Sequence, residues 1–548
     1  MLLLSSILIP LALCADIAIA LRPNGMLNRA APIAPIPEEA LSQGPVVSRN
    51  GTQLPPYNTT YIFNQLIDHN NPSLGTFQQR YWHTYEWYET GSPIILFTPG
   101  EANAAPYTGY LTNVTINGQI AQQQSGATIV LEHRFYGLSN PVPNLSGKNL
   151  KLHTIQQAID DLEYFANNVV LPMPDGGNLS PATAPWVLIG GSYSGALTSW
   201  TMVNKPDVFW AGYASSAVVE AILDYWGYFE PIRQFMPANC SADVEAVIAH
   251  VDEVFSGNDA TAIQVLKDNW GLGEMTHLDD VAGCIRNNLW DWQSLSPSSG
   301  PGATFFDFCD ALEVKDGVNA PASGWGLDHA LTAWGSFWNE TYLNALCGGD
   351  DVVDCLGSYD PDSAEYTDIA LDNAGRSWTW IVCNEVGFLQ EGPPENVPAI
   401  VTRLVQPAYD IRQCVLMFSD VFSSPADVPM AAGVANVDKT YTGWNVSIDR
   451  LFFANGQRDP WREATVSADG VDVPSTNTQP IAIGDGFHCS DLSTANGNVD
   501  ATVLAVQTKA LAFMKTWLAE WTPPSKTPKR DIQAGTARSS RVFRDVAL

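Results

Sequence analysis

Basic residues are scarce in this sequence of 548 residues. It has 27 Lys and Arg against 58 Asp and Glu, which gives a formal net charge of −31 at pH 7 and a pI near 4.4. The acidic residues are spread along the chain, so the charge repels the phosphates of nucleic acid and anionic membranes. We therefore expect neither nucleic acid nor a membrane as a partner. Carboxylates stay ionised down to about pH 4, so this surface suits a protein that stays soluble in acid surroundings.

Long apolar runs are also lacking, except at the start of the chain. Residues 1–20 are apolar and end in Ala18-Ile19-Ala20, which has the small-x-small pattern of a signal-peptidase site. Pro10 and Asp16 interrupt the run, which argues against the alternative of a membrane anchor. We expect a signal peptide and a secreted protein, with the vacuole as an alternative destination.

Metal-binding patterns are missing as well. No two of the nine cysteines form a Cys-x-x-Cys pair, and none lies in a histidine cluster at ligand spacing, so we expect no metal and no other cofactor. Without Cys14 of the signal peptide eight cysteines remain, and an even set in a secreted chain predicts disulfides. Only Cys347 and Cys355 are close enough in sequence to suggest a pair.

N-glycans are expected on the secreted chain, because it contains several N-x-S/T sequons. The sequons begin at Asn50, Asn58, Asn113, Asn144, Asn178, Asn239, Asn339 and Asn445.

After the signal peptide, the composition and the secondary-structure signals of the sequence change several times. Residues 21–56 are rich in Pro and Ala and predict a propeptide or N-terminal arm. Residues 57–217 alternate strand and helix signals, which favours a mostly parallel sheet flanked by helices. The expected elements of this part are strands at 94–97, 127–131 and 186–189 and a helix at 154–169 with Thr154 as its N-cap.

The middle of the chain predicts an inserted, mainly helical domain. Residues 218–440 are rich in Trp and Asp and carry seven of the eight remaining cysteines. Strand signals return within 441–522, at 451–454 and 480–483, before a final helix at 503–517. Residues 523–548 are Pro-rich and basic and predict a disordered tail. We expect an α/β fold whose sheet continues after the insertion.

The clearest chemical motif is Leu188-Ile189-Gly190-Gly191-Ser192-Tyr193-Ser194-Gly195. A strand that turns sharply into a helix needs small residues at the turn, and it raises the central serine above the sheet with the helix N-terminus behind it. This predicts a nucleophile elbow with Ser192 as the nucleophile. Position 194 is Ser where the G-x-S-x-G pattern has Gly, so a Gly/Ser-rich turn or anion-binding loop remains the alternative.

A serine nucleophile needs a histidine base and an acid that orients the base. The α/β-hydrolase fold has the order Ser, acid, His along the chain, with acid and base on loops after late strands. His488 follows the strand signal at 480–483, and Asp459 follows the strand signal at 451–454. We predict the triad Ser192, Asp459 and His488. His250, His277 and His329 lie in the predicted insertion and His133 precedes the nucleophile, so these four histidines are interpreted as structural.

Two main-chain N–H groups should stabilise the oxyanion, one from the residue after the nucleophile and one from a loop after an early strand. Tyr193 is the first candidate, and Gly100 or Glu101 is the second. The Glu101 side chain has two alternatives: it binds a substrate amine, or it forms a salt bridge with Arg134.

These motifs together resemble the proline-specific serine peptidases that include lysosomal Pro-X carboxypeptidase, dipeptidyl peptidase II and fungal acid prolyl endopeptidases. The matching stretches occur in the family's order between about Tyr57 and Trp517. They are Thr98 to Glu101, Leu131 to Gly137, Gly190 to Leu197, Trp378 to Trp380 with Cys383 to Glu385, Asn455 to Trp461 and Gly486 to Leu492.

The resemblance implies an α/β-hydrolase core with a helical cap inserted between nucleophile and acid, and cleavage on the carboxyl side of proline in peptide or protein substrates. Together with the acidic composition, it also suggests an acid pH optimum. It supports Ser192, Asp459 and His488 position by position. Ser194 and Trp461-Arg462-Glu463 resemble the fungal branch, which places the animal exopeptidase specificities in doubt.

Proline can be selected by a flat apolar slot, because it has a fixed φ and no N–H to satisfy. Trp378, Trp380 and Trp461 are our candidates for the walls of this slot. Two other functions stay open at this point: a secreted lipase or esterase of the same fold, and a non-catalytic hydrolase fold used for binding.

Overall fold

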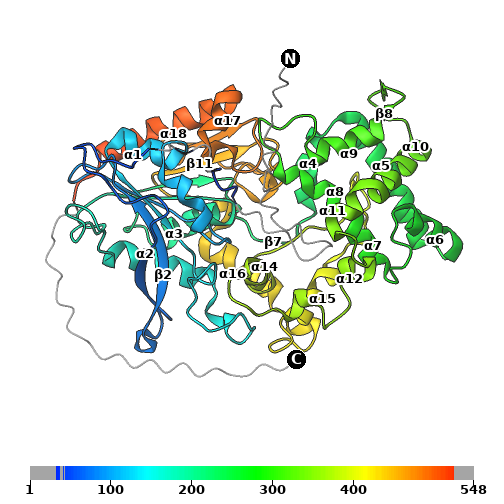
Figure 1. Cartoon of the computed structure of the whole chain (residues 1–548), viewed down its shortest axis with the longest axis horizontal. Coiled ribbons are helices and arrows are strands. Elements are labelled where there is room, and N and C mark those ends of the chain that lie inside the picture. The colour runs from blue at the N-terminus through cyan, green and yellow to red at the C-terminus, as the bar shows by residue number, and fades with distance from the viewer. Residues whose placement is uncertain (1–32, 38–40, 42–43, 524–548) are drawn as a thin grey trace, which may run out of the picture.

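The computed structural model describes residues 33–37, 41 and 44–523. The predicted signal peptide and the predicted tail from residue 524 onward lie outside the described residues. Figure 1 shows an α/β part built around a sheet, beside a helical part that is formed by the middle of the chain. In the described part of the chain, no helix combines the length and the apolar character needed to cross a bilayer.

The main sheet has eight strands in the order β1-β2-β4-β3-β5-β6-β11-β12. β1 and β2 are antiparallel to their neighbours. The other six strands, β4, β3, β5, β6, β11 and β12, are parallel to one another. The parallel strands are short and, apart from the edge strand β12, fully buried, as expected for strands covered by helices on both faces. The strands are β1 (Tyr61–Leu66), β2 (Thr76–Thr84), β3 (Ile94–Phe97), β4 (Ala127–Leu131), β5 (Trp186–Gly191), β6 (Ala211–Ser215), β11 (Leu451–Gly456) and β12 (Ile481–Gly484).

Helices cover both faces of this sheet. α1 (Ile116–Gln124) and α18 (Ala501–Ala519) lie on one face, and α2 (Ile155–Asn168) and α3 (Ser192–Asn204) lie on the other (Figure 1). The side chain of Thr154 accepts a hydrogen bond from Gln157 N at the start of α2, so the predicted N-cap is confirmed. α17 (Thr494–Val499) leads into α18.

The chain between β6 and β11 is mainly helical and contributes no strand to the main sheet. Its apolar core is continuous with the core on the α2 face of the sheet. Its helices are α4 (Glu230–Phe235), α5 (Ala238–Ser256), α6 (Ala260–Asn269), α7 (Leu278–Ile285), α8 (Asn287–Trp290), α9 (Thr304–Glu313), α10 (Leu327–Phe337), α11 (Leu343–Cys347), α12 (Val352–Leu356), α13 (Ala364–Thr367), α14 (Ala374–Ile381), α15 (Pro407–Met417) and α16 (Met430–Tyr441). Its short strands are β7 (Ile222–Asp224), β8 (Val314–Lys315), β9 (Val318–Asn319) and β10 (Gly387–Leu389).

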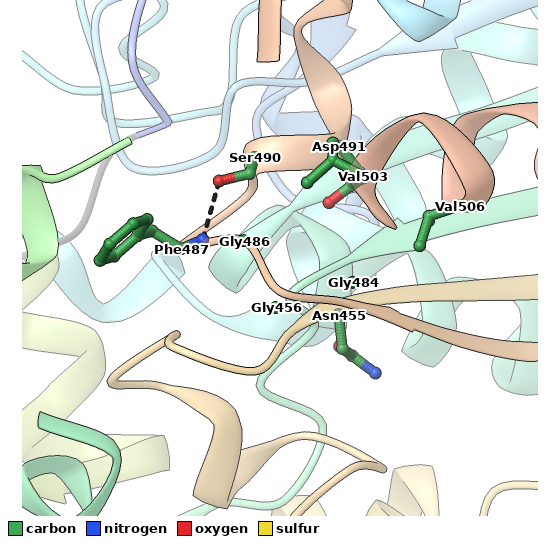
Figure 2. A pocket seen from close by; sticks show the side chains of 9 residues that line it. All are labelled: Asn455, Gly456, Gly484, Gly486, Phe487, Ser490, Asp491, Val503 and Val506. Atoms are coloured by element: carbon green, nitrogen blue, oxygen red, sulfur yellow. Dashed lines mark hydrogen bonds between the residues drawn. The ribbon is translucent and has the colours of Figure 1, made fainter. Parts of the chain in front are cut away.

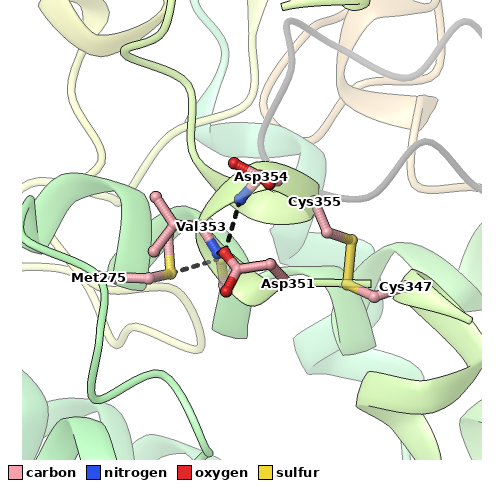
Figure 3. Close-up of a disulfide and its surroundings, with 7 residues drawn as sticks. Met275, Cys347, Asp351, Val353, Asp354 and Cys355 are labelled. Atoms are coloured by element: carbon pink, nitrogen blue, oxygen red, sulfur yellow. Dashed lines mark hydrogen bonds between the residues drawn. A yellow bond between two sulfur atoms is a disulfide. The ribbon is translucent and has the colours of Figure 1, made fainter. Parts of the chain in front are cut away.

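The insertion holds the three disulfides of the described residues. Cys240–Cys309 joins α5 to α9, and Cys383–Cys414 joins the turn after α14 to α15. The predicted Cys347–Cys355 pair is confirmed and closes the short loop before α12, whose first turn is capped by Asp351 (Figure 3).

The even set of cysteines does not pair completely. Cys284 and Cys489 are both buried and lie outside the three disulfides. They are far apart in the fold: the Cys284 thiol approaches Met275 Sδ at 3.8 Å, whereas the Cys489 thiol faces Ser215 O at the end of β6. Counting cysteines could not reveal this, because pairing depends on the distances that the fold creates.

The described part of the predicted N-terminal arm packs on the core. Ile33 is 3% exposed, and its main-chain oxygen accepts a hydrogen bond from Tyr107 Oη at 2.6 Å. Ala34 O accepts a second bond from Tyr110 Oη at 2.9 Å. The arm is thus held by the segment that follows β3.

Candidate active site

Ser192 occupies a strained turn between β5 and α3. Its φ is +57°, in the left-handed region that is costly for residues other than glycine. It is also the first residue of α3, where main-chain N–H groups have no acceptor within the helix. The strand-to-helix turn that the sequence predicts is therefore present, and its strain is held by the packing around it.

The glycines of the elbow allow three close approaches of main chain. A Cβ on Gly190 would lie 2.0 Å from Ser194 O, and a Cβ on Gly195 would lie 2.6 Å from Ser215 O at the end of β6. A Cβ on Gly191 would lie 2.9 Å from the Cys489 thiol. A side chain at any of these positions would therefore displace Ser192 or its neighbours.

Ser194, the departure from the usual pattern, has a local role. Its hydroxyl donates to Gly191 O at 2.8 Å and accepts from Gly191 N at 3.1 Å. Both bonds are buried and close the turn that carries Ser192. Where the usual pattern has a flexible glycine, Ser194 therefore stabilises the turn with two hydrogen bonds to Gly191.

Asp459 and His488 are joined by a hydrogen bond of 2.8 Å between Asp459 Oδ1 and His488 Nδ1. Asp459 is fully buried, and the His488 side chain is 4% exposed. The bond fixes the orientation of the ring and leaves Nε2 as the nitrogen that can accept a proton. Within the described residues, Nε2 has no hydrogen-bond partner. No hydrogen bond links Ser192 to His488 in this part of the chain; catalytic bonds are often long before substrate binds.

The surroundings of His488 favour its protonated form. Burial alone would lower the pKa of His488, but the charge of Asp459 and the neighbouring Cys489 outweigh burial and raise the pKa well above the ordinary value. Such a pair stabilises the imidazolium that forms when the histidine accepts a proton from a serine.

Neighbouring loops hold the acid and the base in place. Gln457 N donates to Gly484 O, and Arg458 N donates to Gly486 O. These two main-chain hydrogen bonds join the loop with Asp459 to the loop with His488. Asp491 accepts hydrogen bonds from Tyr213 at 2.6 Å and Ser215 at 2.7 Å, both on β6. These bonds tie the histidine loop to the strand beside the elbow.

Figure 2 shows a small cavity behind this loop, beside the bond from Phe487 N to Ser490 Oγ. Its volume of about 10 Å³ has room for roughly one water molecule, so it is not a substrate pocket. None of the three predicted triad residues lines it. The lining residues are Asn455, Gly456, Gly484, Gly486, Phe487, Ser490, Asp491, Val503 and Val506.

The insertion contacts both loops, through residues that the sequence did not single out. Trp292 donates from Nε1 to Arg458 O at 2.7 Å, and its ring packs on Phe487 at 5.3 Å. Gln293 Oε1 accepts from Trp461 Nε1 at 2.8 Å. The positions of residues beside Asp459 and beside His488 thus depend on contacts with the insertion. Only the abundance of Trp in this region hinted at such contacts.

The predicted oxyanion residues lie around the elbow. Gly100 has φ +78°, and a Cβ there would lie 3.1 Å from Ser194 Cβ, so the turn after β3 approaches α3 closely. Tyr193 is fully buried directly after Ser192. The structure leaves Gly100 and Glu101 as alternatives for the second donor.

Glu101 does not pair with Arg134, so the second of the two alternatives for its side chain is wrong. Arg134 forms a bidentate pair with Asp161, at 2.6 Å for both bonds. Glu101 is 2% exposed, and its Oε2 has no hydrogen-bond partner within the described residues. Burial raises the pKa of Glu101 to about 8, against the opposing effects of its own main-chain N–H and of His488. The carboxyl is therefore protonated in neutral and acid solution.

The three predicted tryptophans lie in different places. The ring of Trp378 contacts Tyr193 edge to face at 5.4 Å, and the ring of Trp461 lies 6.4 Å from His488. Trp380 packs instead on Phe418 and Phe422. Residues two apart on a helix point to opposite sides, so α14 can direct only one of its two tryptophans toward the elbow.

Trp461 belongs to an aromatic group that the sequence did not reveal as a unit. Its ring centroid lies 5.5 Å from Tyr225 and 5.4 Å from both Tyr228 and Phe388. Tyr225, Tyr228 and Phe388 all come from the insertion, so distant segments form one buried aromatic cluster near His488.

The parallel sheet, the flanking helices and the strand-to-helix turn after β5 define an α/β-hydrolase. The chain belongs to the serine carboxypeptidase S28 family, whose model matches residues 65–280 and 337–510. The protein is a serine peptidase by this membership. The predicted resemblance and fold class are thus confirmed.

Known relatives agree with this assignment. The chain is 35% identical over 492 residues to serine protease vicPb of Bipolaris victoriae (strain FI3), which covers 86% of this chain and 91% of that protein. It is 31% identical over 473 residues to a probable extracellular serine carboxypeptidase of Arthroderma benhamiae, which covers 81% of this chain and 64% of that protein. A solved acetylester hydrolase from Corynebacterium glutamicum aligns at 11% identity with a TM-score of 0.33, over 83% of this chain and 95% of its own; this likeness is too weak to bear on activity.

Proposed function

We propose that this protein is a secreted peptidase that hydrolyses peptide bonds on the carboxyl side of proline, as an endopeptidase or a Pro-X carboxypeptidase. The hydrogen bond between Asp459 and His488, on loops packed against the elbow of Ser192, is the observation that carries the proposal. In this mechanism Ser192 attacks the scissile carbonyl, and His488 takes its proton and passes it to the leaving amine. Water then hydrolyses the acyl-enzyme by the same steps in reverse.

The developing oxyanion is bound by the N–H of Tyr193 and a second N–H from Gly100 or Glu101. The start of α3 supports this role, because its amides point out of the helix and its dipole favours negative charge there. An esterase would use the same groups, so the preference for peptides rests on the family and on the aromatic cluster beside the triad.

The proline ring is accepted by aromatic side chains on the two sides of the elbow. Trp378 borders Tyr193, and Trp461 borders His488 together with Tyr225 and Phe388. An apolar surface suits proline because the residue has no N–H that would be left without a partner. Trp380 is not part of this proposal.

A free substrate amine is not required in this proposal. An ammonium group is best bound by an ionised carboxylate, whereas burial raises the pKa of Glu101 to about 8 and keeps it neutral in acid. This favours an endopeptidase or a carboxypeptidase over an enzyme that removes N-terminal dipeptides. We further propose that residues 218–440 act as a cap that borders the path of the substrate.

Secretion and glycosylation are part of the proposal. Six of the predicted sequon asparagines, Asn50, Asn58, Asn113, Asn178, Asn339 and Asn445, are exposed, as a glycan attachment site must be. The relative from Arthroderma benhamiae is named as extracellular. An acid pH optimum, suggested by composition and by the family resemblance, is part of the proposal as well. Because Asp459 raises the pKa of His488, activity in acid then depends on the small neutral fraction of the imidazole that acts as base.

The proposal is tested with the purified protein and Ser192→Ala on a blocked Gly-Pro-nitroanilide, from about pH 4.5 to neutrality. We expect the parent alone to release nitroaniline. A long-chain ester and a blocked Gly-Ala-nitroanilide are the matched controls, and neither should be cleaved at a comparable rate. Equal release by Ser192→Ala, or preference for the ester, would rule the proposal out.

A further inference from the structure

His133 lies behind the residue that follows Ser192. It comes from the loop after β4, and its Nε2 is 3.1 Å from the Tyr193 hydroxyl. Its Nδ1 is 2.7 Å from Arg134 O. A carbonyl oxygen only accepts, so Nδ1 carries the ring proton and Nε2 accepts the hydrogen bond from Tyr193.

The neutral form of His133 is maintained by its surroundings. Burial is the largest influence and lowers the pKa of His133 to about 4, although Arg134 O and Asp161 act in the opposite direction. The ring is enclosed by Tyr136 at 5.3 Å and His153 at 5.7 Å. His133 therefore remains an acceptor for Tyr193 at pH values above about 4.

Tyr193 is held from two directions. His133 binds its hydroxyl from the sheet side, while Trp378 of the insertion meets the ring edge to face at 5.4 Å. The same tyrosine follows Ser192, whose φ of +57° needs support from its surroundings. Because the amide of Tyr193 is in the first turn of α3, no intrahelical hydrogen bond fixes its direction.

We propose that His133 is a positioning residue for the oxyanion hole, which it orients through its hydrogen bond to the Tyr193 side chain. This inference rests on the proposed function, in which the Tyr193 N–H binds the oxyanion. The bond anchors the far end of a rigid side chain, so the peptide plane between Ser192 and Tyr193 keeps one orientation. The N–H then points to the oxyanion before the reaction begins, and no reorganisation is needed during catalysis.

The experiment compares Tyr193→Phe, His133→Phe and the double variant, with His133→Gln as the conservative replacement. Phenylalanine keeps the ring volume and removes the hydrogen bond, whereas glutamine can place an amide oxygen near the position of Nε2. Active sites are counted by complete labelling of Ser192 with a fluorophosphonate, and kcat is expressed per labelled site. This count separates unfolded protein from slow enzyme.

We expect kcat to fall roughly tenfold in each single Phe variant with KM unchanged, because loss of a whole oxyanion donor costs about 100- to 1,000-fold. The double variant should be no slower than either single variant, and His133→Gln should recover most of the activity. Inhibition by a peptide aldehyde, which forms a tetrahedral adduct, should weaken in parallel with kcat/KM, while inhibition by the cleaved product should not change.

Two results would overturn the inference: kcat per labelled site that stays within about twofold of the parent in both single variants, or independent effects that multiply in the double variant. A merely structural role would lower the labelled fraction and the melting temperature but leave kcat per site and the aldehyde affinity unchanged. If His133→Phe does not fold, Tyr193→Phe, which loses one oxygen atom, decides the matter. A parent protein that the fluorophosphonate does not label would contradict the proposed function itself, which is a distinguishable result.

Discussion

Gly191 packs directly against Cys489, so the residue before Ser192 touches the residue after His488. A Cβ on Gly191 would lie 2.9 Å from the Cys489 thiol and 2.9 Å from a methyl group of Leu492. This contact sets the spacing between the elbow and the histidine loop. The distance between nucleophile and base therefore depends on the absence of one side chain.

Gly191→Ala should fold and lose activity. The added methyl group must push the two loops apart, and a displacement of about 1 Å at reacting groups can cost about 100-fold in rate. We expect kcat to fall by roughly that factor. Gly300→Ala is the matched control, because a Cβ at Gly300 meets nothing within 4 Å. Unchanged kcat in Gly191→Ala would show that the loops are not coupled in this way.

Asp459→Asn should remove most of the activity without unfolding the protein. The amide cannot stabilise the imidazolium and favours the wrong tautomer, which lowers kcat by roughly 10⁴-fold in a Ser-His-Asp triad. The residual activity should extend to lower pH, because Asp459 is the main group that raises the pKa of His488. Asp485→Asn, which removes the ion pair with Arg458 on the same two loops, should keep near-normal kcat. The comparison is made on pH–rate profiles.

Ser194→Ala should destabilise the fold by about 1 kcal/mol, the usual cost of losing a capping side chain. The variant leaves Gly191 N without its buried partner. Ser199→Ala is the matched control in the same helix, since the Ser199 hydroxyl is buried with no hydrogen-bond partner among the described residues. Urea unfolding should show a loss of stability for position 194 and none for position 199; equal curves would contradict the capping role.

Stability should fall as the pH rises from about 6.5 to 8. Burial raises the pKa of Glu101 to about 8 and that of Glu385 to about 7. In this range the folded protein holds protons that the unfolded chain has released, so each such group weakens the fold by up to about 1.4 kcal/mol per pH unit. Melting temperatures at pH 6.5, 7.2 and 8.0 check the slope.

The control for this slope is Glu385→Gln, which keeps an acceptor for Ile155 N, bound at 2.8 Å, but does not titrate. It should flatten the dependence between pH 6.5 and 7. Buried histidines such as His83, whose pKa is lowered to about 4, act with the opposite sign, but only below their ordinary value near 6.5. A melting temperature that rises with pH across this window would refute the prediction.

The disulfides should differ in their contribution to stability. Loop entropy predicts about 4.4 kcal/mol for Cys240–Cys309, which closes 69 residues, and about 2.5 kcal/mol for Cys347–Cys355, which closes eight residues. Double Cys→Ser variants of each pair, compared by thermal unfolding under oxidising conditions, should show the larger loss for the first pair. The reverse order would mean that native packing, rather than the entropy of the unfolded chain, determines how much each disulfide stabilises the fold.

Much of the α/β core could be predicted from local pattern. The strands 94–97 and 127–131 match β3 and β4 residue for residue, because short runs of apolar residues between turn signals are typical of strands buried on both faces. β1 and β2 were not predicted. Their exposed and buried residues mix, since they form an antiparallel edge, and Gln65 and Gln79 are buried there through a mutual hydrogen bond.

The candidate site divides in a similar way. Ser192, Asp459 and His488 were proposed from sequence because each follows a strand signal in the order that the fold requires. The partners of these residues were not found, since Trp292 reaches Arg458 across 166 positions and Asp491 reaches Ser215 across 276. Periodicity reports only a residue's immediate neighbours, so it carries no information about such contacts.

By itself the sequence determined most of the parallel strands, the small residues of the elbow and the identity of the three candidate catalytic groups, because these depend on local patterns of residues. Tertiary structure alone decided which cysteines pair, that Arg134 binds Asp161 rather than Glu101, and that Trp378 faces Tyr193 while Trp380 does not. It also placed His133 behind Tyr193. These outcomes depend on distances between segments far apart in the chain, which are set only when the insertion packs against the sheet.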